Sequence, residues 1–513
     1  MTKEREHIIS EIKRQIEKGN TSRQKIDREL CDRSFFEFVK LFWNVVIPEK
    51  PIWNWHIEYL CSELQKISGD IIDRKPKTYD LLINIPPGTT KSTIVTIMFP
   101  AWLWSKDPTL RIISNSYSSD ISTEHAIKSR DIVLSPRFRK LFPHVVIRKD
   151  KSGKQSYDTT MNGARYTTST GGAITGKHAH LIINDDPQNP KQAESEAHRI
   201  QSIEHTKTLA SRKVDKEVSV TITVMQRLNT KDVSGYLLEN KSERLKHIKL
   251  PAEITEKTRP IPETDTISER DAETIIEKYI KKDNLLDTVR LTRSSIDEAK
   301  VDLGTRGYNG QFLQNPTAED GDIVKRDWFR IISQEDFYRK FSRSFIPMHF
   351  FLDTAYTEHN ENDPTGILAV CKIGNDMFIT NRMKIRKEFP ELIKFIPEYA
   401  KANGYTDEST IRIEPKANGL SVIQTLQRET NLNITKTKMP KDDKKTRLYA
   451  ASPKIECGRV YLVEGLWNKE FIDEVCGFPN AAHDEDVDLL GYAIDYFLSD
   501  EIQGEEVVSN ILW

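Results

Sequence analysis

The sequence contains few cysteines and almost no net charge. Its five cysteines in 513 residues are scattered and form no C-x-x-C pair: Cys31, Cys61, Cys371, Cys457 and Cys476. This spacing argues against a disulfide framework and a thiolate zinc site, and it fits a reducing compartment. Lysine and arginine total 76 against 77 for aspartate and glutamate. The net charge therefore creates no long-range attraction for a polyanion. A partner such as DNA would have to be held by local basic patches.

Long apolar runs and a targeting segment are also missing. The two most apolar stretches, FFEFVKLFWNVVIP and STIVTIMFPAWLW, are short or interrupted by charge, so neither can span a bilayer. The N-terminus, MTKEREHIISEIKRQIEKG, is charged throughout. We therefore expect a soluble, untargeted protein with no membrane partner. Its length predicts roughly two to four domains.

Residues 81–105 (LLINIPPGTTKSTIVTIMFPAWLWS) predict a strand, a tight loop and the start of a buried helix. Such a loop aims backbone N–H groups and a helix N-terminus at one point, where a phosphate is stabilised and a lysine reaches the β and γ phosphates. We therefore expect a nucleotide phosphate site. Its binding segment would be Gly88, Thr89, Thr90, Lys91, Ser92 and Thr93.

Two glycines are missing from this loop. The full phosphate-loop pattern is G-x-x-x-x-G-K-[ST], and here Ile85 and Thr90 occupy the glycine positions while Lys91 and Ser92 fit. An ordinary Pro-Gly turn before a core helix would look similar, so the assignment needs a partner elsewhere in the chain.

The segment HLIINDDP, residues 180–187, supplies that partner. It predicts an apolar strand ending in two acids. A carboxylate at such a strand tip holds Mg²⁺, here Asp185 together with the Ser92 hydroxyl, and a second acid, Asp186, activates the attacking water. An Asp-Pro turn is the alternative. The order of lysine loop, intervening strand at 111–114 and acidic strand favours an ATPase.

A further predicted strand, residues 219–227 (SVTITVMQR), ends in Gln226 and Arg227. Side chains at a strand end beside a nucleotide site often sense the γ-phosphate. A turn residue would have the same appearance, so both remain candidates only.

From Met348 the pattern becomes three short strands followed by alternating helices and strands, an order that resembles the ribonuclease H-like fold. In that fold the first and fourth strands are central neighbours. Asp353 after the first strand and Glu414 after the fourth would then lie side by side.

The closing helix, within residues 484–498 (DEDVDLLGYAIDYFL), adds a third acid. The apolar residues of this helix recur at helical spacing and define the face expected to be buried. Asp484 projects from that same face, and Asp488 lies one turn further on. Three converging carboxylates can hold two metal ions about 4 Å apart, the apparatus of two-metal phosphodiester cleavage. Singly, each acid is equally well explained as a turn former or as a helix-dipole partner. Their joint placement predicts a nuclease.

Two weaker signals lie close to these acids. Asp363 and His483 are candidate supporting groups and equally plausible loop residues. The run KTKMPKDDKKTR at 436–447 would hold a phosphate backbone without reading sequence, unless it is simply a solvated charged face.

Several stretches make the chain resemble bacteriophage large terminase subunits. They are PPGTTKST; SYSSDISTEHAIKSRDIVLSPRFRKLFP; GGAITGKHAHLIINDDP; VMQRLNTKDVSGYLL; YNGQFLQNPTAEDGDIV; FLDTAY with NDPTG; IEPKANG; and FPNAAHDEDVDLLGYAIDY. Together they run in order from about residue 35 to 498. The resemblance implies a RecA-like ASCE P-loop ATPase domain in front of a ribonuclease H-like nuclease domain, with ATP and with Mg²⁺ or Mn²⁺ as cofactors.

The resemblance also implies site residues and departures. Lys91 and Ser92 match the phosphate loop, Asp185 and Asp186 the acidic strand end, and Asp353, Glu414 and Asp484 the nuclease acids. The arginine that many members carry inside the loop is missing, and Arg130 is a weak candidate for an arginine finger across a ring interface. The usual HDD triplet reads His483, Asp484, Glu485, so the third metal ligand, Asp484 or Asp488, stays open.

These signals predict five segments: an N-terminal helical segment 1–55, an ATPase domain 56–252, a linker or small subdomain 253–340, a nuclease domain 341–498 and an acidic tail 499–513. The resemblance implies an ATP-driven motor, working in the host cytoplasm as a homo-oligomeric ring. It would move double-stranded DNA through a portal protein into a procapsid, with a small terminase subunit, and cut the concatemer. A non-viral ATP-dependent repair nuclease or helicase, and a DNA-docking scaffold with a degenerate ATPase, are the alternatives.

Overall fold

The computed structural model describes residues 23–241, 244–254, 269–317, 323–341, 346–354, 364–416, 418–439, 442–479, 481 and 483–498. Asp363, the tail after Leu498 and residues 1–22 of the predicted N-terminal helical segment lie outside these ranges. The chain forms two compact units, and each is described by itself. They comprise Met1–Asp297 with Arg306–Ala318, and Glu298–Thr305 with Glu319–Trp513.

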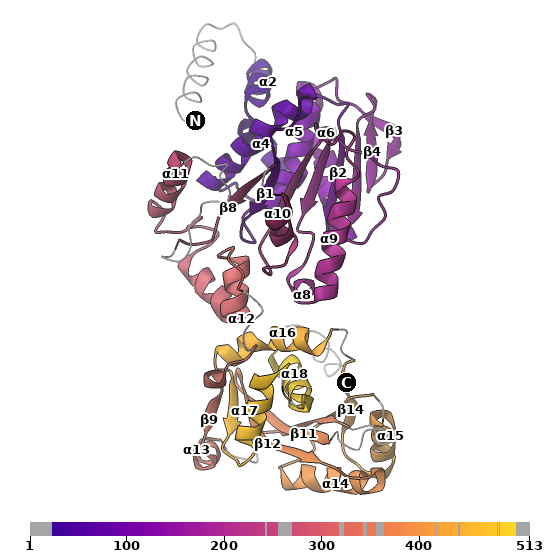
Figure 1. The fold of residues 1–513 in the computed structure, drawn as a ribbon, viewed down its shortest axis with the longest axis vertical. Coiled ribbons are helices and arrows are strands. Elements are labelled where there is room, and N and C mark those ends of the chain that lie inside the picture. The colour runs from indigo at the N-terminus through magenta and orange to yellow at the C-terminus, as the bar shows by residue number, and fades with distance from the viewer. Residues whose placement is uncertain are drawn as a thin grey trace, which may run out of the picture. The chain divides into compact units, whose positions relative to one another are not determined.

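The first unit is built on an eight-stranded sheet of order β3-β4-β5-β2-β6-β7-β1-β8 (Figure 1). The strands from β5 to β8 in this order run parallel, and β3 and β4 add an antiparallel hairpin at one edge. Their bounds are β1 Asp80–Asn84, β2 Arg111–Ser116, β3 Ile147–Ser152, β4 Ser156–Thr159, β5 Ala164–Ser169, β6 Leu181–Asp185, β7 Val220–Met225 and β8 Leu245–Lys249.

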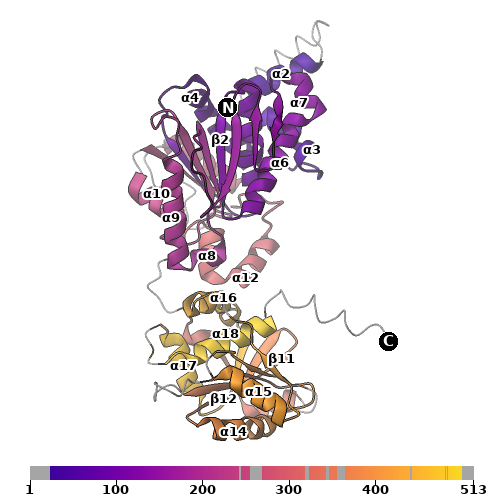
Figure 2. The same cartoon turned by 90° about the vertical axis from the view of Figure 1, so that its right-hand side faces the viewer.

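Helices cover both faces of this sheet, which explains why its central strands are continuously apolar. Helices η1, α5 and α6 pack together on one face, and α9 and α10 lie on the other (Figure 2). The helices are α2 Arg23–Arg33, α3 Phe35–Val46, α4 Trp55–Asp73, η1 Thr93–Met98, α5 Phe99–Lys106, α6 Ser119–Leu134, α7 Pro136–Leu141, α8 Pro190–Ala193, α9 Glu196–Ala210, α10 Val233–Lys241, α11 Glu269–Ile280 and α12 Arg293–Gln311.

The aromatic segment before β1 is a packing element. The Ser34 hydroxyl caps α3 by accepting a hydrogen bond from the Glu37 amide. Phe35 and Phe38 then project from the buried face of α3, and Phe35 packs against Trp102 of α5 with ring centroids 5.1 Å apart and the rings tilted by 37°. In the part of the chain that the structure describes, no helix has the length and hydropathy needed to cross a bilayer.

The second unit has a seven-stranded sheet of order β14-β13-β10-β11-β12-β15-β9. The first and fourth strands of the predicted series, β10 and β13, pair in parallel at the centre, which confirms the ribonuclease H-like order. The strands are β9 Arg330–Ile332, β10 His349–Asp353, β11 Thr365–Ile373, β12 Asp376–Ile385, β13 Ile411–Ile413, β14 Ile434–Lys436 and β15 Val460–Val463.

Two apolar layers sandwich this second sheet. Alternate residues of β10 point to opposite faces, so Phe351 packs on one side with α18 and Phe350 packs on the other with α14 and α15. The helices are η3 Arg326–Trp328, α13 Gln334–Lys340, α14 Phe389–Ala402, α15 Gly419–Glu429, α16 Lys444–Glu456, α17 Asn468–Gly477 and α18 Glu485–Leu498. Of these, η3, α13 and α17 have no counterpart in the prediction from sequence.

We expect Phe351→Ala to lower the free energy of unfolding of the second unit by about 3–5 kcal/mol, because it removes a large buried ring and leaves a cavity. Phe351 is 1% exposed and lies 6.0 Å from the ring of Tyr496. Urea unfolding of the full chain measures the change. Leu466→Ala, at a fully exposed position of the same unit, is the matched control and should leave the transition in place. Equal shifts in both variants would contradict the packing described.

Candidate active sites

The loop after β1 bends through two left-handed residues although both glycines of the phosphate-loop pattern are missing. Gly88 has φ +73° and Thr90 has φ +64°, both in the left-handed region. A β-branched residue is strained there by roughly 1–3 kcal/mol, so the surrounding structure must hold Thr90 in place. The glycine position of the sequence pattern therefore keeps its backbone conformation with a threonine.

Buried side chains brace this loop from below. The Thr89 hydroxyl donates to the Pro86 carbonyl at 2.7 Å, and His56 Nε2 lies 3.2 Å from the Thr89 carbonyl. Asn54 Nδ2 lies 2.7 Å from the other ring nitrogen of His56. Burial lowers the pKa of His56 to about 4, so the ring is neutral and can accept from Asn54 while donating to Thr89.

Strand order brings the acids to the phosphate loop. Strand β7 separates β1 from β6, and all three run parallel, so the loop after β1 and the acids at the end of β6 share one edge of the sheet. Lys91 Nζ lies 2.9 Å from Asp186 Oδ2, and its side chain is 8% exposed. The sequence-predicted pair of lysine and acid is therefore in direct contact.

Asp185 is surrounded by donors. It accepts hydrogen bonds from the hydroxyls of Ser92, at 3.0 Å, and Thr96, at 2.6 Å, and His125 Nδ1 lies 3.4 Å away. Burial, with the neighbouring Asp186 charge, raises the pKa of Asp185 to about 7. A divalent cation would favour its ionised form. The pairing of Ser92 with Asp185 therefore fits Mg²⁺ bound by a hydroxyl and a carboxylate.

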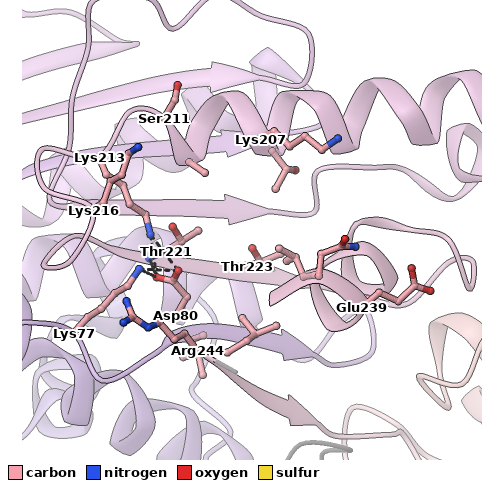
Figure 3. A pocket seen from close by; sticks show the side chains of 16 residues that line it. Lys77, Asp80, Lys207, Ser211, Lys213, Lys216, Thr221, Thr223, Glu239 and Arg244 are labelled. Atoms are coloured by element: carbon pink, nitrogen blue, oxygen red, sulfur yellow. Dashed lines mark hydrogen bonds and ion pairs between the residues drawn. The ribbon is translucent and has the colours of Figure 1, made fainter. Parts of the chain in front are cut away.

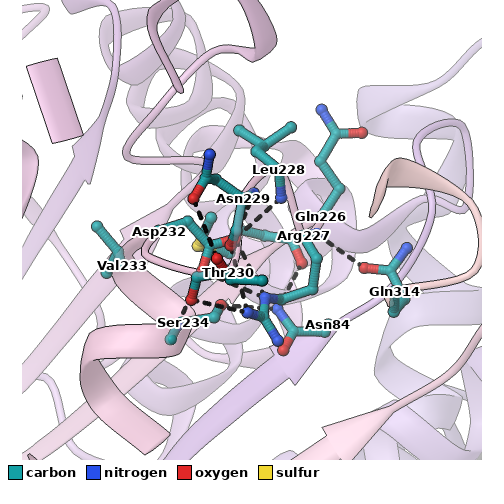
Figure 4. Close-up of polar contacts among 12 residues, drawn as sticks. Asn84, Gln226, Arg227, Leu228, Asn229, Thr230, Asp232, Val233, Ser234 and Gln314 are labelled. Atoms are coloured by element: carbon teal, nitrogen blue, oxygen red, sulfur yellow. Dashed lines mark hydrogen bonds and ion pairs between the residues drawn. The ribbon is translucent and has the colours of Figure 1, made fainter. Parts of the chain in front are cut away.

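The residues after β7 play two different parts (Figure 4). The Arg227 guanidinium forms an ion pair within its own loop, because its Nε lies 3.1 Å from the buried Asp232 carboxylate. The Gln226 side chain is buried, and its Oε1 has no hydrogen-bond partner among the described residues. Of the two γ-phosphate sensors considered from sequence, Gln226 has a buried acceptor without a hydrogen-bond partner among the described residues, whereas the Arg227 guanidinium is paired with Asp232.

Arg130 lies on the outer part of the first unit. Its Nη1 donates to the carbonyls of Ser152 and Gly153 at 2.7 and 2.9 Å, next to the β3–β4 hairpin. Within one chain the guanidinium is thus held by backbone oxygens, and its suggested part as a finger across a ring stays a prediction.

In the second unit, Asp353 at the end of β10 and Glu414 just after β13 come together as the topology predicts. Burial, with the Glu414 and Asp488 charges, raises the pKa of Asp353 to about 7. Lys416 Nζ lies 2.5 Å from Glu414, which contributes to lowering the pKa of that carboxyl. Two adjacent carboxyls with opposite pKa shifts behave as a pair that shares a proton until a cation binds.

Asp488, one turn inside α18, is the third acid of this group. It is 3% exposed, and its charge acts on Asp353. Asp484 precedes the helix and its side chain is 44% exposed. Lys444 Nζ bridges the two, 2.6 Å from Asp484 and 2.7 Å from Asp488, and Arg447 also pairs with Asp488.

The acids of the second unit are thus balanced by side-chain cations. Among the described residues, no three histidine, cysteine or carboxylate side chains already have the arrangement of a metal site. The carboxylate oxygens of Asp353, Glu414 and Asp488 are nevertheless hard ligands that suit Mg²⁺ or Mn²⁺, and their mutual repulsion favours such a cation. These residues therefore fit a divalent metal, which would compete with Lys444 and Arg447 for Asp488.

Comparison with known proteins identifies the second unit. Residues 351–497 match the family model of the terminase RNaseH-like domain. The match covers β10 to α18 and includes Asp353, Glu414, Asp484 and Asp488, so it confirms the terminase resemblance over this domain. No curated protein sequence matches the chain.

Solved terminase structures are similar to this chain at low sequence identity. A large terminase from a thermophilic bacteriophage is 10% identical, with 85% of this chain and 98% of that chain covered and a TM-score of 0.49. The bacteriophage HK97 large terminase is 12% identical, with 87% of this chain and 92% of that chain covered and a TM-score of 0.33. The human cytomegalovirus terminase nuclease domain is 14% identical, with 34% of this chain and 96% of that chain covered and a TM-score of 0.27. Since every TM-score is below 0.5, the sites are assigned from the geometry of this chain.

Sequence reasoning missed several neighbours of the acids. Thr96 lies four residues after Ser92, a spacing that could have indicated a second hydroxyl on the same face, whereas His125 carries no sequence signal. Lys444 and Arg447 belong to the basic run at 436–447, and sequence reasoning did not foresee that both pair with Asp488. His483 Nδ1 lies 3.7 Å from Glu485 Oε1, at the domain's surface.

We expect His56→Gln to remove part of the acid sensitivity of the first unit. The folded pKa of His56, about 4, lies below its ordinary value of 6.5, so its contribution to stability is present above pH 6.5 and is lost as pH falls toward 4. Between about pH 7 and about pH 5 the native chain should lose about 2 kcal/mol more unfolding free energy than the variant. Urea unfolding at both pH values measures the difference. Parallel losses would show that the ring is not held neutral.

Proposed function

We propose that this chain is the large subunit of a viral DNA-packaging terminase. The first unit hydrolyses ATP to drive double-stranded DNA into a procapsid, and the second cuts concatemeric DNA with a divalent metal. The proposal is supported by one combination: a phosphate loop with Lys91 on Asp186, and a carboxylate group inside a domain that matches the terminase RNaseH-like family.

In the ATPase, each residue has a chemical part. Lys91 would bind the β and γ phosphates, and the backbone N–H groups of residues 88–93 would surround them. Ser92 and Asp185 would hold Mg²⁺, which neutralises phosphate charge. Asp186 would orient the attacking water and accept its proton, with the spare Gln226 oxygen as a second acceptor for that water.

In the nuclease, Asp353, Glu414 and Asp488 would hold Mg²⁺ or Mn²⁺. Such ions supply an activated water and stabilise the leaving oxygen of a phosphodiester. Lys444 and Arg447 lie beside these acids and would bind the DNA backbone once they leave Asp488. Asp484, more exposed, would bind Lys444 or an outer water.

The same proposal includes partners. The chain would work as a homo-oligomeric ring on a portal protein in the host cytoplasm, with a small terminase subunit delivering the DNA. A DNA-docking scaffold with an inactive ATPase is the alternative that the threonine at the strained position of the phosphate loop favours.

We expect Lys91→Ala to lower DNA-stimulated ATP turnover by about 100-fold or more and to leave metal-dependent DNA cutting intact, because the phosphates lose their charged donor. Asp353→Ala should have the reverse effect. Phosphate release and plasmid cleavage by the full chain measure the two activities. A native chain without ATP turnover would support the scaffold, and a variant that keeps both activities would refute its residue's assignment.

A second pair of variants identifies the third metal ligand. We expect Asp488→Asn to lower DNA cutting by about 100-fold or more, while Asp484→Asn keeps it within about 10-fold, since the amide is isosteric but loses the ligand charge. Cleavage rates over a Mn²⁺ titration measure both. The opposite order of effects would assign the metal to the exposed acid before the helix.

A further inference from the structure

A cavity of about 720 Å³ lies in the first unit, away from the phosphate loop. It is lined by Lys77 and Asp80 before and at the start of β1, Thr221 at the start of β7 and Leu245 at the start of β8. These are the amino ends of parallel strands, whereas the phosphate loop and Asp185 follow carboxyl ends. The cavity is therefore at the opposite end of the parallel strands from the phosphate loop, about one strand length or 16 Å away.

Cations dominate the polar lining of this cavity. Five positively charged side chains and two carboxylates face it (Figure 3): Lys77, Lys207, Lys213, Lys216 and Arg244, with Asp80 and Glu239. Lys207 comes from α9, Glu239 from α10, and Lys213 and Lys216 from the segment between α9 and β7. Lys207 and Arg244 pair with Glu204 and Glu217, at 2.6 and 2.9 Å, so the positive charge without a matching acid is concentrated at Lys77, Lys213 and Lys216.

Two of these lysines are buried on a single acid. The Lys77 and Lys213 ammonium groups lie 2.9 and 3.1 Å from Asp80 Oδ2, and each side chain is 7% exposed. The Thr221 amide donates to Asp80 Oδ1 at 2.7 Å, which fixes the carboxylate. Asp80 thereby holds two ammonium groups side by side, and burial next to Lys77 contributes to lowering the pKa of Lys213 to about 8.

One carboxylate cannot neutralise two buried ammonium groups. A buried charge without compensation is unfavourable, and each ammonium has three N–H donors, so the pair can stabilise a second anion. We propose that this cavity binds a small phosphate-bearing anion. Its oxygens would accept hydrogen bonds from Lys77 and Lys213, with the positive charge of Lys216 at the rim. Lys207 and Arg244, which pair with Glu204 and Glu217, would add further donors there.

The size and walls of the cavity define the class of ligand. At 720 Å³ the space exceeds a bare phosphate and falls in the range of small-molecule sites. Apolar side chains, Leu81, Leu237 and Leu245, line it beside the cations and could contact the organic part of a nucleotide. Duplex DNA does not fit, because lysines only 7% exposed cannot reach its backbone.

The test is calorimetric titration of inorganic pyrophosphate and of ADP into the full chain carrying Lys91→Ala, which removes the lysine of the phosphate loop. We expect pyrophosphate to bind with a Kd below about 1 mM. Lys213→Met in this background should weaken binding about 10-fold or more, and Lys207→Gln at the exposed rim should weaken it about 3-fold. Lys282→Gln, an exposed lysine outside the cavity, is the matched control and should change nothing.

Tighter binding of ADP than of pyrophosphate would identify a nucleotide as the source of the phosphate, and equal affinities would identify the phosphate group alone. Both outcomes support the site if they depend on Lys213 and Lys207. No pyrophosphate binding up to about 10 mM would overturn the proposal, as would Kd values unchanged in both lysine variants. Because Lys207→Gln alters only a half-exposed side chain, it remains informative if Lys213→Met fails to fold. The result does not depend on ATP hydrolysis at the phosphate loop.

Discussion

The close approach of like-charged carboxylates at the ends of buried strands is the interaction on which both sites depend. Parallel strands bring their carboxyl ends to one edge, so Asp185 and Asp186 meet the phosphate loop, and Asp353 meets Glu414. Burial makes their mutual repulsion stronger than it would be in water. Side-chain cations offset this repulsion. Lys91 pairs with Asp186 in one unit, and Lys444 and Arg447 pair with Asp488 in the other.

These ion pairs hold the charged side chains of both sites in position before a phosphate or a metal ion binds. A lysine that already contacts an acid is positioned for a phosphate, and a carboxyl whose pKa is near 7 gains charge when a divalent ion binds. The left-handed Thr90 adds backbone strain at the same point as Lys91. The contacts of His56 and Thr89 show that buried side chains support the loop next to the position where its sequence pattern has a glycine.

Much of this arrangement was predictable because it follows from apolar periodicity and strand direction. The runs around Ile83, Ile183 and Leu352 are buried strands, and each ends in the polar residues expected to work there. The two-domain fold and the contacts of Lys91 with Asp186 and of Ser92 with Asp185 follow from the order of these segments. The parallel pairing of β10 with β13 explains why Asp353 and Glu414 meet.

Other features depend on tertiary packing and have no local signal. Helical periodicity placed Asp484 on the buried face, but α18 begins at Glu485, and of the two candidate ligands Asp484 and Asp488 it is Asp488 that is buried. Arg447 belongs to a basic run that the sequence left open as a phosphate-backbone contact or a solvated face, and its pairing with Asp488 has no signal in the sequence. Arg227 looked like a phosphate sensor, yet it pairs with Asp232 five residues away, a contact that only the turn after β7 creates.

The central claim is that one chain holds two separate sites for phosphate chemistry, each with its own divalent ion. Anomalous diffraction from crystals grown with Mn²⁺ and a non-hydrolysable ATP analogue tests it most directly. Manganese peaks should appear between Ser92 and Asp185 beside the triphosphate, and again among Asp353, Glu414 and Asp488. Peaks at neither group of oxygens, with Lys444 still on Asp488 and no nucleotide at Lys91, would contradict it.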